Sequence, residues 1–479
     1  MTSSGRQSTS SGNSTLAAYF DEAASHRDHW VARNRYYHDK LAESFAFHIP
    51  SGNTVFEVGS GTGHLLAALK PARGLGIDLS PAMVRLAQQS YPNLEFRVED
   101  AMTLNAAERF DYVVISDLLG FLPDVQCCFE NLRQACHSRT RLVISFYNAL
   151  WQPLLALAER GGLKARQPAQ NWLGMADVEN LLYLAGFEVI LRQPRLLLPV
   201  NVPLLAPLCN RYLVNLPVLG HLGLVAMIVA RLKPVQAKQS PSVSIIVPAR
   251  NERGNIEAVV QQTPQLGDHT ELIFVEGNST DGTAQEIERV IAAHPDKDIK
   301  LIPQGSGRGK GDAVRKGFHA ARCDVLMILD ADLTVSPEDL PKFYHTLISG
   351  LGEFVHGSRF VYPMEKRAMR FLNMLGNKFF SVAFTHVLGQ RFKDTLCGTK
   401  VLFRRDYEKI AANRSYFGEF DPFGDFDLIF GATKLDLKIV EIPVHYRERT
   451  YGTTNISRFR HGWLLLRMVW YALWKIKLV

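Results

Sequence analysis

A short apolar run that ends in two acids constrains this chain more than any other feature. Residues 325–329 (VLMIL) are followed by Asp330, Ala331 and Asp332. A run this short favours a buried strand over a helix. Side chains two residues apart on a strand point the same way, so Asp330 and Asp332 can jointly bind a hard cation such as Mg²⁺ or Mn²⁺. The alternative is that the two acids merely end the strand in a solvated turn.

Composition limits the number of domains and the class of partner. With 479 residues, 47% of them hydrophobic, the chain suits two or three domains. The net charge of +7 comes from dispersed basic residues, which favours phosphate or anionic lipid over nucleic acid. The six cysteines show no CxxC pair, which predicts reduced thiols, no zinc and a cytoplasmic protein. Residues 1–14 are rich in Ser, Thr and Gly, and we expect 1–29 to be a disordered tail followed by the start of a helix.

A glycine-rich turn follows the first predicted strand, at residues 54–58. Gly59, Gly61 and Gly63 allow a ligand to approach the backbone closely, and a helix beginning just after them offers free N–H groups. The next predicted strand ends at Asp78, at the distance expected for an acid that accepts ribose hydroxyls. Strands at 94–98 and 112–116 end at Asp100 and Asp117. A purely structural turn and a dinucleotide dehydrogenase are the alternative interpretations.

With Glu57 preceding the first glycine, this pattern resembles the class I S-adenosylmethionine-dependent methyltransferases over residues 30–232. The resemblance implies a Rossmann-like fold in which the glycine turn holds the amino-acid part of the cofactor. It also implies that Asp78 binds the ribose, that Asp100 binds the adenine amine and that Glu57 orients the turn. No motif identifies the methyl acceptor or its catalytic base. The residues near predicted strand ends or in loops that are candidates for substrate contact are Asp117, His137, Tyr147, Asn148, Asn171 and Trp172.

The segment 196–232 is strongly apolar, and residues 212–230 carry no formal charge. That length approaches what a membrane-spanning helix needs. Prolines and glycines within and before it favour short pieces and turns, ending in a strand at 225–230 that closes the first domain. A patch resting on a membrane is a second alternative. Residues 233–242 are polar with two prolines and are predicted to be a linker.

Strand and helix signals alternate again from residue 243, which predicts a second α/β domain over 243–460. Residues 248–252 read PARNE, 278–283 read NSTDGT, 309–313 read GKGDA and 330–332 read DAD. The glycines around Arg308 and Lys310 suit contact with phosphate.

In this order the motifs resemble glycosyltransferase family 2, closest to its dolichol-phosphate mannosyltransferase-like branch. The resemblance implies a GT-A fold, a nucleotide-diphosphate sugar donor, Mg²⁺ or Mn²⁺, and inversion at the anomeric carbon. The metal would be held by Asp330 and Asp332, with Asp332 also counted as catalytic. The implied donor-binding residues are Pro248, Arg250, Glu252, Glu276, Asp281, Lys310 and Asp330. The chain departs from the branch at Glu276, Thr334 and Asn455, where Asp, Gln and Lys are usual.

We expect the acceptor to be a polyprenyl phosphate on the cytoplasmic face of a membrane. A phosphate oxyanion needs cations rather than a base, and Arg359, Arg370 and Arg449 are the predicted acceptor-binding residues. A predicted helix at 370–388 could carry an isoprenoid along its apolar face. The runner-up acceptor is a sugar hydroxyl, which requires a carboxylate base. The candidates for that base are Asp394, Asp425 and Asp427. The predicted catalytic residues are therefore Asp332, Asp394, Asp427 and Arg359.

Residues 461–479 place Trp, Tyr and cations around aliphatic residues, which predicts an amphipathic helix at a membrane surface. A terminal helix packed on the core is the alternative. Taken together, the sequence predicts two doubly wound α/β domains that form a bifunctional enzyme, cytoplasmic or peripheral on the inner face of a membrane. In the alternative function, the N-terminal half binds S-adenosylmethionine only as a scaffold or sensor.

Overall fold

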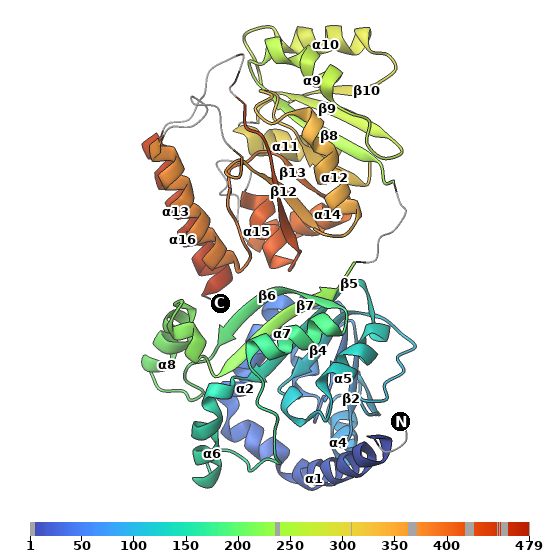
Figure 1. Ribbon diagram of the computed structural model, residues 1–479, viewed down its shortest axis with the longest axis vertical. Coiled ribbons are helices and arrows are strands. Elements are labelled where there is room, and N and C mark those ends of the chain that lie inside the picture. The colour runs from blue at the N-terminus through green and yellow to red at the C-terminus, as the bar shows by residue number, and fades with distance from the viewer. Residues whose placement is uncertain are drawn as a thin grey trace. The chain divides into compact units, whose positions relative to one another are not determined.

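A computed structural model describes residues 5–234, 240–307, 309–362, 371–416, 426–447, 449, 451 and 458–478. They form two compact units, Met1–Lys233 and Pro234–Lys477, each with its own seven-stranded sheet (Figure 1). The predicted α/β class with two doubly wound domains is confirmed. Of the predicted linker, residues 235–239 lie outside the described part of the chain.

The sheet of the first unit has the order β3-β2-β1-β4-β5-β7-β6, and β7 runs antiparallel to both of its neighbours. Its strands are β1 Thr54–Val58, β2 Arg73–Asp78, β3 Glu95–Val98, β4 Phe110–Ser116, β5 Cys136–Tyr147, β6 Phe187–Arg195 and β7 Val225–Leu232. Its helices are α1 Gly5–Arg33, α2 Arg35–His48, α3 His64–Ala68, α4 Pro81–Ser90, α5 Val125–Leu132, α6 Gln152–Arg160, α7 Met175–Leu184 and α8 Leu205–Pro207. Successive residues of β1 enter separate apolar cores, Val55 in one and Phe56 in the other, so both faces of the sheet are covered.

Two expectations for this unit concern its ends. The predicted closing strand at 225–230 is confirmed as part of β7, and the apolar residues before it form short helical turns. Among the described residues, no helix is long and apolar enough to cross a membrane. The expectation of a disordered tail to residue 14 is wrong from Gly5 onward, because α1 begins there. Extending an existing helix adds a hydrogen bond per residue without a new nucleation cost, which lets α1 continue through residues of low helix propensity.

The second unit has the sheet order β10-β9-β8-β11-β13-β12-β14, in which β13 is antiparallel to β11 and β12. Its strands are β8 Val243–Ala249, β9 Thr270–Glu276, β10 Asp298–Pro303, β11 Val325–Ile328, β12 Phe354–Ser358, β13 Lys400–Phe403 and β14 Ile439–Pro443. Its helices are α9 Ile256–Gln262, α10 Thr283–Ala293, α11 Gly309–Ala320, α12 Leu340–Ile348, α13 Phe371–Leu388, α14 Arg404–Ala412, α15 Phe426–Lys434 and α16 Arg458–Ala472. The buried strand predicted at 325–329 is therefore confirmed as β11.

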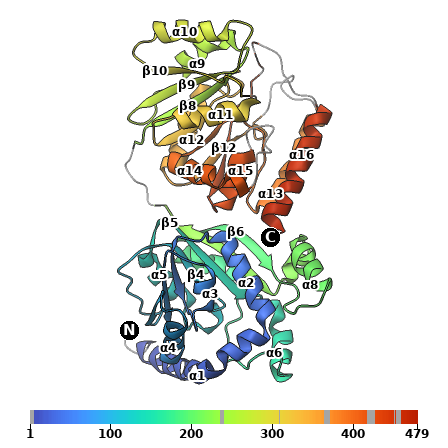
Figure 2. The same ribbon diagram turned by 180° about the vertical axis from the view of Figure 1, so that it is seen from behind.

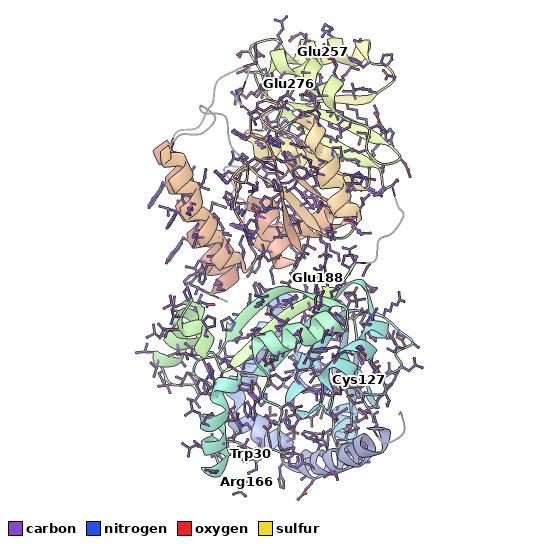
Figure 3. All side chains as sticks on the ribbon, viewed as in Figure 1. Trp30, Cys127, Arg166, Glu188, Glu257 and Glu276 are labelled. Atoms are coloured by element: carbon purple, nitrogen blue, oxygen red, sulfur yellow. The ribbon has the colours of Figure 1, made fainter. Side chains whose placement is uncertain are left out.

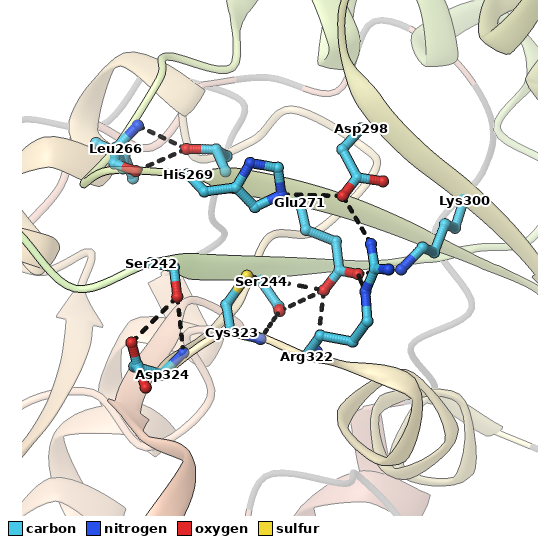
Figure 4. Close-up of polar contacts among 11 residues, drawn as sticks. Ser242, Ser244, Leu266, His269, Glu271, Asp298, Lys300, Arg322, Cys323 and Asp324 are labelled. Carbon is cyan, nitrogen blue, oxygen red and sulfur yellow. Dashed lines mark hydrogen bonds and ion pairs between the residues drawn. The ribbon is translucent and has the colours of Figure 1, made fainter.

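A polar network connects the amino ends of β8, β9 and β10 (Figure 4). The Glu271 side chain is fully buried and accepts hydrogen bonds from Ser244 Oγ (2.6 Å) and Arg322 Nε (3.0 Å), while Lys300 pairs with it as well. Burial alone would raise the pKa of Glu271, but these partners lower it to about 2. The network lies at the edge opposite to the carboxyl ends of the strands.

The terminal helix α16 packs along α13 (Figures 1 and 2). Its inward face carries buried Leu465 and Met468, whereas Trp463 and Trp470 are exposed. One face is therefore packed on the unit, as the core-packed alternative expects, and the other presents tryptophan to solvent. Attachment of 461–479 to a membrane stays a prediction.

Candidate functional site

The glycine turn of the first unit has the backbone that its sequence predicts. Gly59, Gly61 and Gly63 have φ of 74°, 52° and 80°, in the region that favours glycine. A Cβ at Gly59 would lie 2.9 Å from Leu118, and a Cβ at Gly63 would lie 2.6 Å from Phe96. A Cβ at Gly61 would meet nothing within 4 Å, so its backbone borders open space. The turn can accept a ligand at Gly61.

Asp78 joins that turn to the end of β2. Its Oδ2 accepts from the Gly61 backbone N–H (2.8 Å), and its Oδ1 accepts from the Ser80 backbone N–H (2.9 Å). Burial raises the pKa of Asp78. At the end of the neighbouring strand β3, Asp100 accepts from the Met102 backbone N–H (2.9 Å). The two carboxylates thus follow adjacent strands, β2 and β3, as the predicted ribose and adenine contacts require.

Glu57 lies beneath the turn in β1. Its side chain is buried, and burial raises its pKa to about 8, so it holds a proton at neutral pH. The Oε2 atom has no hydrogen-bond partner among the described residues. A buried polar atom without a partner beside an open glycine turn fits a site completed by a polar ligand.

A buried cluster at the ends of β4 and β5 contains two residues that the sequence did not indicate, Tyr37 and Ser145. The hydroxyl of Tyr37, from α2, donates to Asp117, and the Ser145 hydroxyl donates to Asp117 Oδ1 (2.9 Å). The Tyr147 ring lies 6.2 Å from that of Tyr37. Burial raises the pKa of Asp117, whose φ of 53° is strained for a residue with a side chain. The YY pair at 36–37 carried no motif that marked it in advance.

Three of the other candidates for contact with the methyl acceptor pair with groups outside this cluster. Asn148 donates to the carbonyls of His221 (2.9 Å) and Gly223 (3.0 Å), which holds a loop. His137 lies at the opposite end of β5, 3.5 Å from Asp111, and Asn171 donates to the Leu122 carbonyl (2.7 Å). These contacts are structural.

In the second unit, the acid pair meets cations at the carboxyl end of β11. Lys310 Nζ lies 2.5 Å from Asp330 Oδ1. Burial alone would raise the pKa of Asp330, but Lys310 outweighs it and the pKa lies below its usual value. Gly398 runs against this pair, because a Cβ there would stand 2.6 Å from Asp330 Cγ. The structure therefore brings together Asp330, Lys310 and the backbone of Gly398.

Arg449 joins two further acids. Its Nη1 donates to Glu252 (3.1 Å) and its Nη2 to Asp332 Oδ2 (2.6 Å), although the sequence predicted a role for Arg449 in acceptor binding. Asp332 Oδ1 accepts from the Thr334 hydroxyl (2.8 Å). Burial raises the pKa of Glu252 despite this neighbouring guanidinium. Arg449 therefore lies among residues assigned to the donor and the metal.

The predicted nucleoside contacts lie at the ends of β8 and β9. Glu276 (Figure 3) accepts from the backbone N–H groups of Asn278 (3.1 Å) and Ser279 (2.6 Å). Asp281 accepts from the Arg253 backbone N–H (3.2 Å) and the Tyr451 hydroxyl (3.2 Å). Pro248 lies in β8, and Arg250, just beyond it, is exposed.

The two described base candidates are both ion-paired. Asp394 is buried, and its two carboxylate oxygens accept hydrogen bonds from Arg359 Nε (2.6 Å) and Nη2 (2.9 Å). Burial alone would raise the pKa of Asp394, but Arg359 lowers it below its usual value. Asp427 accepts a hydrogen bond from Arg414 Nε (2.8 Å). The geometry does not support Asp394 as a free base, because its lone pairs are engaged by Arg359.

Several predicted residues lie outside the described part of the chain: Arg308, Arg370, Asp425 and Asn455. Among the described residues, no group of three or more His, Cys, Asp or Glu side chains is arranged to hold a metal. Mg²⁺ is usually bound by one or two carboxylates together with substrate phosphates, so a pair such as Asp330 and Asp332 is sufficient.

Comparison with known proteins finds two families in the chain. The model described as "Glycosyl transferase family 2" matches residues 244–411, and the model described as "Methyltransferase domain" matches residues 55–138. Dolichol-phosphate mannosyltransferase of Saccharomyces cerevisiae is 38% identical over 109 residues, which are 22% of this chain and 40% of that protein. Polyprenol monophosphomannose synthase of Mycolicibacterium smegmatis is 25% identical over 230 residues, 47% of this chain and 84% of that protein. The chain thus spans less than half the length of the yeast relative.

A solved structure is similar to part of the chain. Magnesium protoporphyrin IX methyltransferase of Synechocystis PCC 6803 with bound SAH is 18% identical, covering 46% of this chain and 99% of that one, with a TM-score of 0.35. Each family match begins in one of the central strands, β1 or β8, and the two matches include the glycine turn and the acid pair. The chain therefore joins a methyltransferase domain, matched over residues 55–138, to a glycosyltransferase family 2 domain, matched over residues 244–411.

Proposed function

We propose that this protein is a bifunctional enzyme. Its first unit transfers a methyl group from S-adenosylmethionine, and its second unit transfers a sugar, with inversion, from a nucleotide-diphosphate sugar to polyprenyl phosphate. The observation that carries the second activity is the charged cluster at one edge of the sheet, where Lys310 meets Asp330 and Arg449 joins Glu252 to Asp332. The names of the yeast and mycobacterial relatives, a dolichol-phosphate mannosyltransferase and a polyprenol monophosphomannose synthase, support a lipid phosphate acceptor.

A divalent metal fits this cluster. Asp330 and Asp332 offer carboxylate oxygens, the ligands that Mg²⁺ and Mn²⁺ prefer, and both carboxylates already lie against cations. When bound there, the metal would neutralise charge that develops on the leaving diphosphate. Lys310 would contact the diphosphate as a second positive charge, and Glu276 and Asp281 would bind the nucleoside side.

The ion pairs favour phosphate over hydroxyl as the acceptor group. A hydroxyl needs a base to remove its proton, yet Asp394 is held by Arg359 and Asp427 by Arg414. A phosphate oxyanion is already deprotonated near neutral pH. Its oxygen would attack the anomeric carbon on the face opposite the departing diphosphate. Arg359, fixed by Asp394, is half of a buried pair that orders the end of β12 next to this site.

For the methyl reaction, the open glycine turn, Asp78 and Asp100 would bind S-adenosylmethionine, and Glu57 would support the turn. The cluster of Tyr37 and Asp117 stands at the end of β4 as a candidate for contact with the methyl acceptor. Both reactions would serve the assembly of a lipid-linked glycan, with the protein peripheral to the cytoplasmic face of a membrane.

The test is an acceptor assay with purified enzyme. A panel of labelled nucleotide sugars is incubated with short-chain polyprenyl phosphate or with the matching alcohol, with and without Mg²⁺ or Mn²⁺. We expect transfer to the phosphate only, and only with metal. Transfer to the alcohol or to soluble glycans alone, or full activity in excess chelator, would overturn the proposal.

A further inference from the structure

An apolar surface covers one side of the first unit. We define it as residues 148–166, which include α6, and residues 197–223, which include α8. Its exposed large side chains include Leu150 (63%), Leu157 (64%), Leu204 (88%) and Val218 (78%). No residue of α6 is buried, although its sequence, QPLLALAER, is rich in leucine. Contiguous apolar exposure of this kind on a folded unit marks an interaction site.

The two segments are built together. Trp151 Nε1 donates to the Leu222 carbonyl (2.7 Å), and Asn148 donates to the neighbouring carbonyls described above. α6 and α8 lie on the same side of the unit in both views (Figures 1 and 2). Asn210 fixes the second segment, since its Oδ1 accepts from the backbone N–H groups of Leu197 (2.8 Å) and Leu198 (2.8 Å). The leucines are therefore held outward by a defined scaffold.

Leu204 is strained as well as exposed. Its φ of 65° is unfavourable for a residue with a Cβ, and its side chain is the most exposed large apolar group of the surface. Such strain persists where the surroundings impose it, and it is concentrated at functional positions. Prolines 199, 203, 207 and 217 break the segment into short turns, which place aliphatic side chains at loop tips rather than in a core.

The charge of this surface identifies its partner. Glu159 is the one acid in the two segments and pairs with Lys164, which leaves Arg160, Arg166 and Arg211 as an excess of positive charge. Arg166, in the loop after α6, is labelled in Figure 3. Protruding leucines among basic residues are the pattern of proteins that rest on anionic lipid, because the apolar side chains enter the interface while the cations meet headgroups.

The surface is continuous with the methyl-transfer site. Lys164 Nζ lies 5.9 Å from the centre of the Tyr147 ring. That ring lies next to the ring of Tyr37, whose hydroxyl donates to Asp117. On α2, Tyr36 accepts a hydrogen bond from Asn210 Nδ2 (3.1 Å), so the residue next to Tyr37 touches the surface. A substrate held in a lipid layer against this surface would be close to Asp117.

We propose that the first unit rests on an anionic bilayer through this apolar surface and takes its methyl acceptor from that bilayer. The docking stands on the surface alone, whereas the bilayer origin of the acceptor rests on the proposed methyl transfer. Lipid contact by the first unit is independent of any contact made by α16 in the second.

The test uses the full-length protein and sedimentation with vesicles. One set of vesicles is phosphatidylcholine alone, and the other contains about one third phosphatidylglycerol. The variant Leu204→Glu/Val218→Glu removes two exposed apolar groups of the surface. Leu184→Glu is the matched control, because Leu184 is 54% exposed but lies at the end of α7, outside the surface. Trp470→Glu reports the contribution of α16.

We expect the double variant to partition onto anionic vesicles about a hundredfold more weakly than the wild type, since each apolar side chain that enters the interface contributes about tenfold. Leu184→Glu should remain within about twofold. Calorimetric binding of S-adenosylmethionine should be unchanged in all three variants. If the wild type does not bind S-adenosylmethionine, the methyltransferase proposal is refuted, and the vesicle result still decides the docking.

Three outcomes would overturn the docking. Partitioning of the double variant like that of the wild type would exclude this surface, and equal binding to neutral vesicles would exclude its charge selectivity. Sedimentation velocity without lipid supplies the third outcome: a wild-type dimer that the double variant dissolves would identify the surface as an interface between copies of this chain.

Discussion

Gly398→Ala isolates the contact on which the sugar-transfer site depends. A methyl carbon at residue 398 would stand 2.6 Å from Asp330 Cγ, whereas carbon atoms in contact are separated by about 3.5–4.0 Å. That methyl carbon would also collide with Lys310 Nζ. To accommodate it, Asp330 and Lys310 must both move away from the Gly398 backbone by about 1 Å. Gly398 does not have a left-handed backbone, so the substitution acts through this collision and not through strain.

A misplacement of about 1 Å in a catalytic site costs on the order of a hundredfold in rate. We therefore expect kcat/KM for sugar transfer to fall about a hundredfold in Gly398→Ala. The matched control is Gly376→Ala, because Gly376 lies in α13 and a Cβ there meets nothing within 4 Å. Helix propensity favours alanine at that position.

Initial rates of transfer to polyprenyl phosphate, measured over a range of donor concentrations, supply kcat/KM for both variants. A cooperative thermal unfolding transition like that of the wild type, measured by calorimetry, checks that each protein is folded. If Gly398→Ala transfers sugar within about threefold of Gly376→Ala while both remain folded, then Asp330 and Lys310 do not have to occupy the positions described here.

Three other substitutions test separate parts of the molecule. Asp332→Asn should abolish metal-dependent sugar transfer and leave S-adenosylmethionine binding intact; wild-type turnover in this variant would exclude Asp332 from the site. Asp78→Ala should weaken S-adenosylmethionine binding about tenfold or more in calorimetry, because a hydrogen bond to a charged group is worth about 1.5–3 kcal/mol, and a change below twofold would mean that Asp78 is not the ribose ligand. Glu271→Gln should lower the free energy of unfolding near pH 7 by about 2 kcal/mol. A shift of the Glu271 pKa from about 4.3 to about 2 is worth about 3 kcal/mol, and solvent screening of the exposed Arg322 reduces that figure. Since the folded pKa of Glu271 is depressed, this contribution is present above about pH 4.3 and is lost as pH falls toward 2, so denaturation curves that show the same difference from wild type at pH 7 and pH 2.5 would contradict it.

The local features of the fold were predictable because short-range pattern determines them. The turn at 59–63 needed glycine for its positive φ, and the run at 325–329 was too apolar and too short for anything but a buried strand. Asp78 and Asp330 follow such strands directly, so their positions came with the strand assignments. The reversed direction of β7 and β13 had no local signal, since pairing direction depends on contacts made after the chain has folded.

Long-range pairing explains the parts of the site that the sequence did not reveal. Tyr37 meets Asp117 across 80 residues, and Arg449 meets Glu252 across 197 residues, separations at which neither residue type nor spacing indicates a partner. The same limit affected Asp394, which looked like a free carboxylate until Arg359 was found to engage both of its oxygens. Sequence indicated which groups were present but not which were already paired.

The first helix has a consequence for any attempt to dissect the protein. Asp21, in α1, accepts from the Ser80 hydroxyl (2.5 Å) and the Ala82 backbone N–H (2.9 Å), at the start of α4 and two residues from Asp78. A methyltransferase fragment cut at residue 30 would lose this acceptor and leave the start of α4 short of a partner next to the ribose acid. A self-contained fragment has to include α1 at least from Asp21, so the N-terminal boundary of the minimal methyltransferase lies well before its glycine turn.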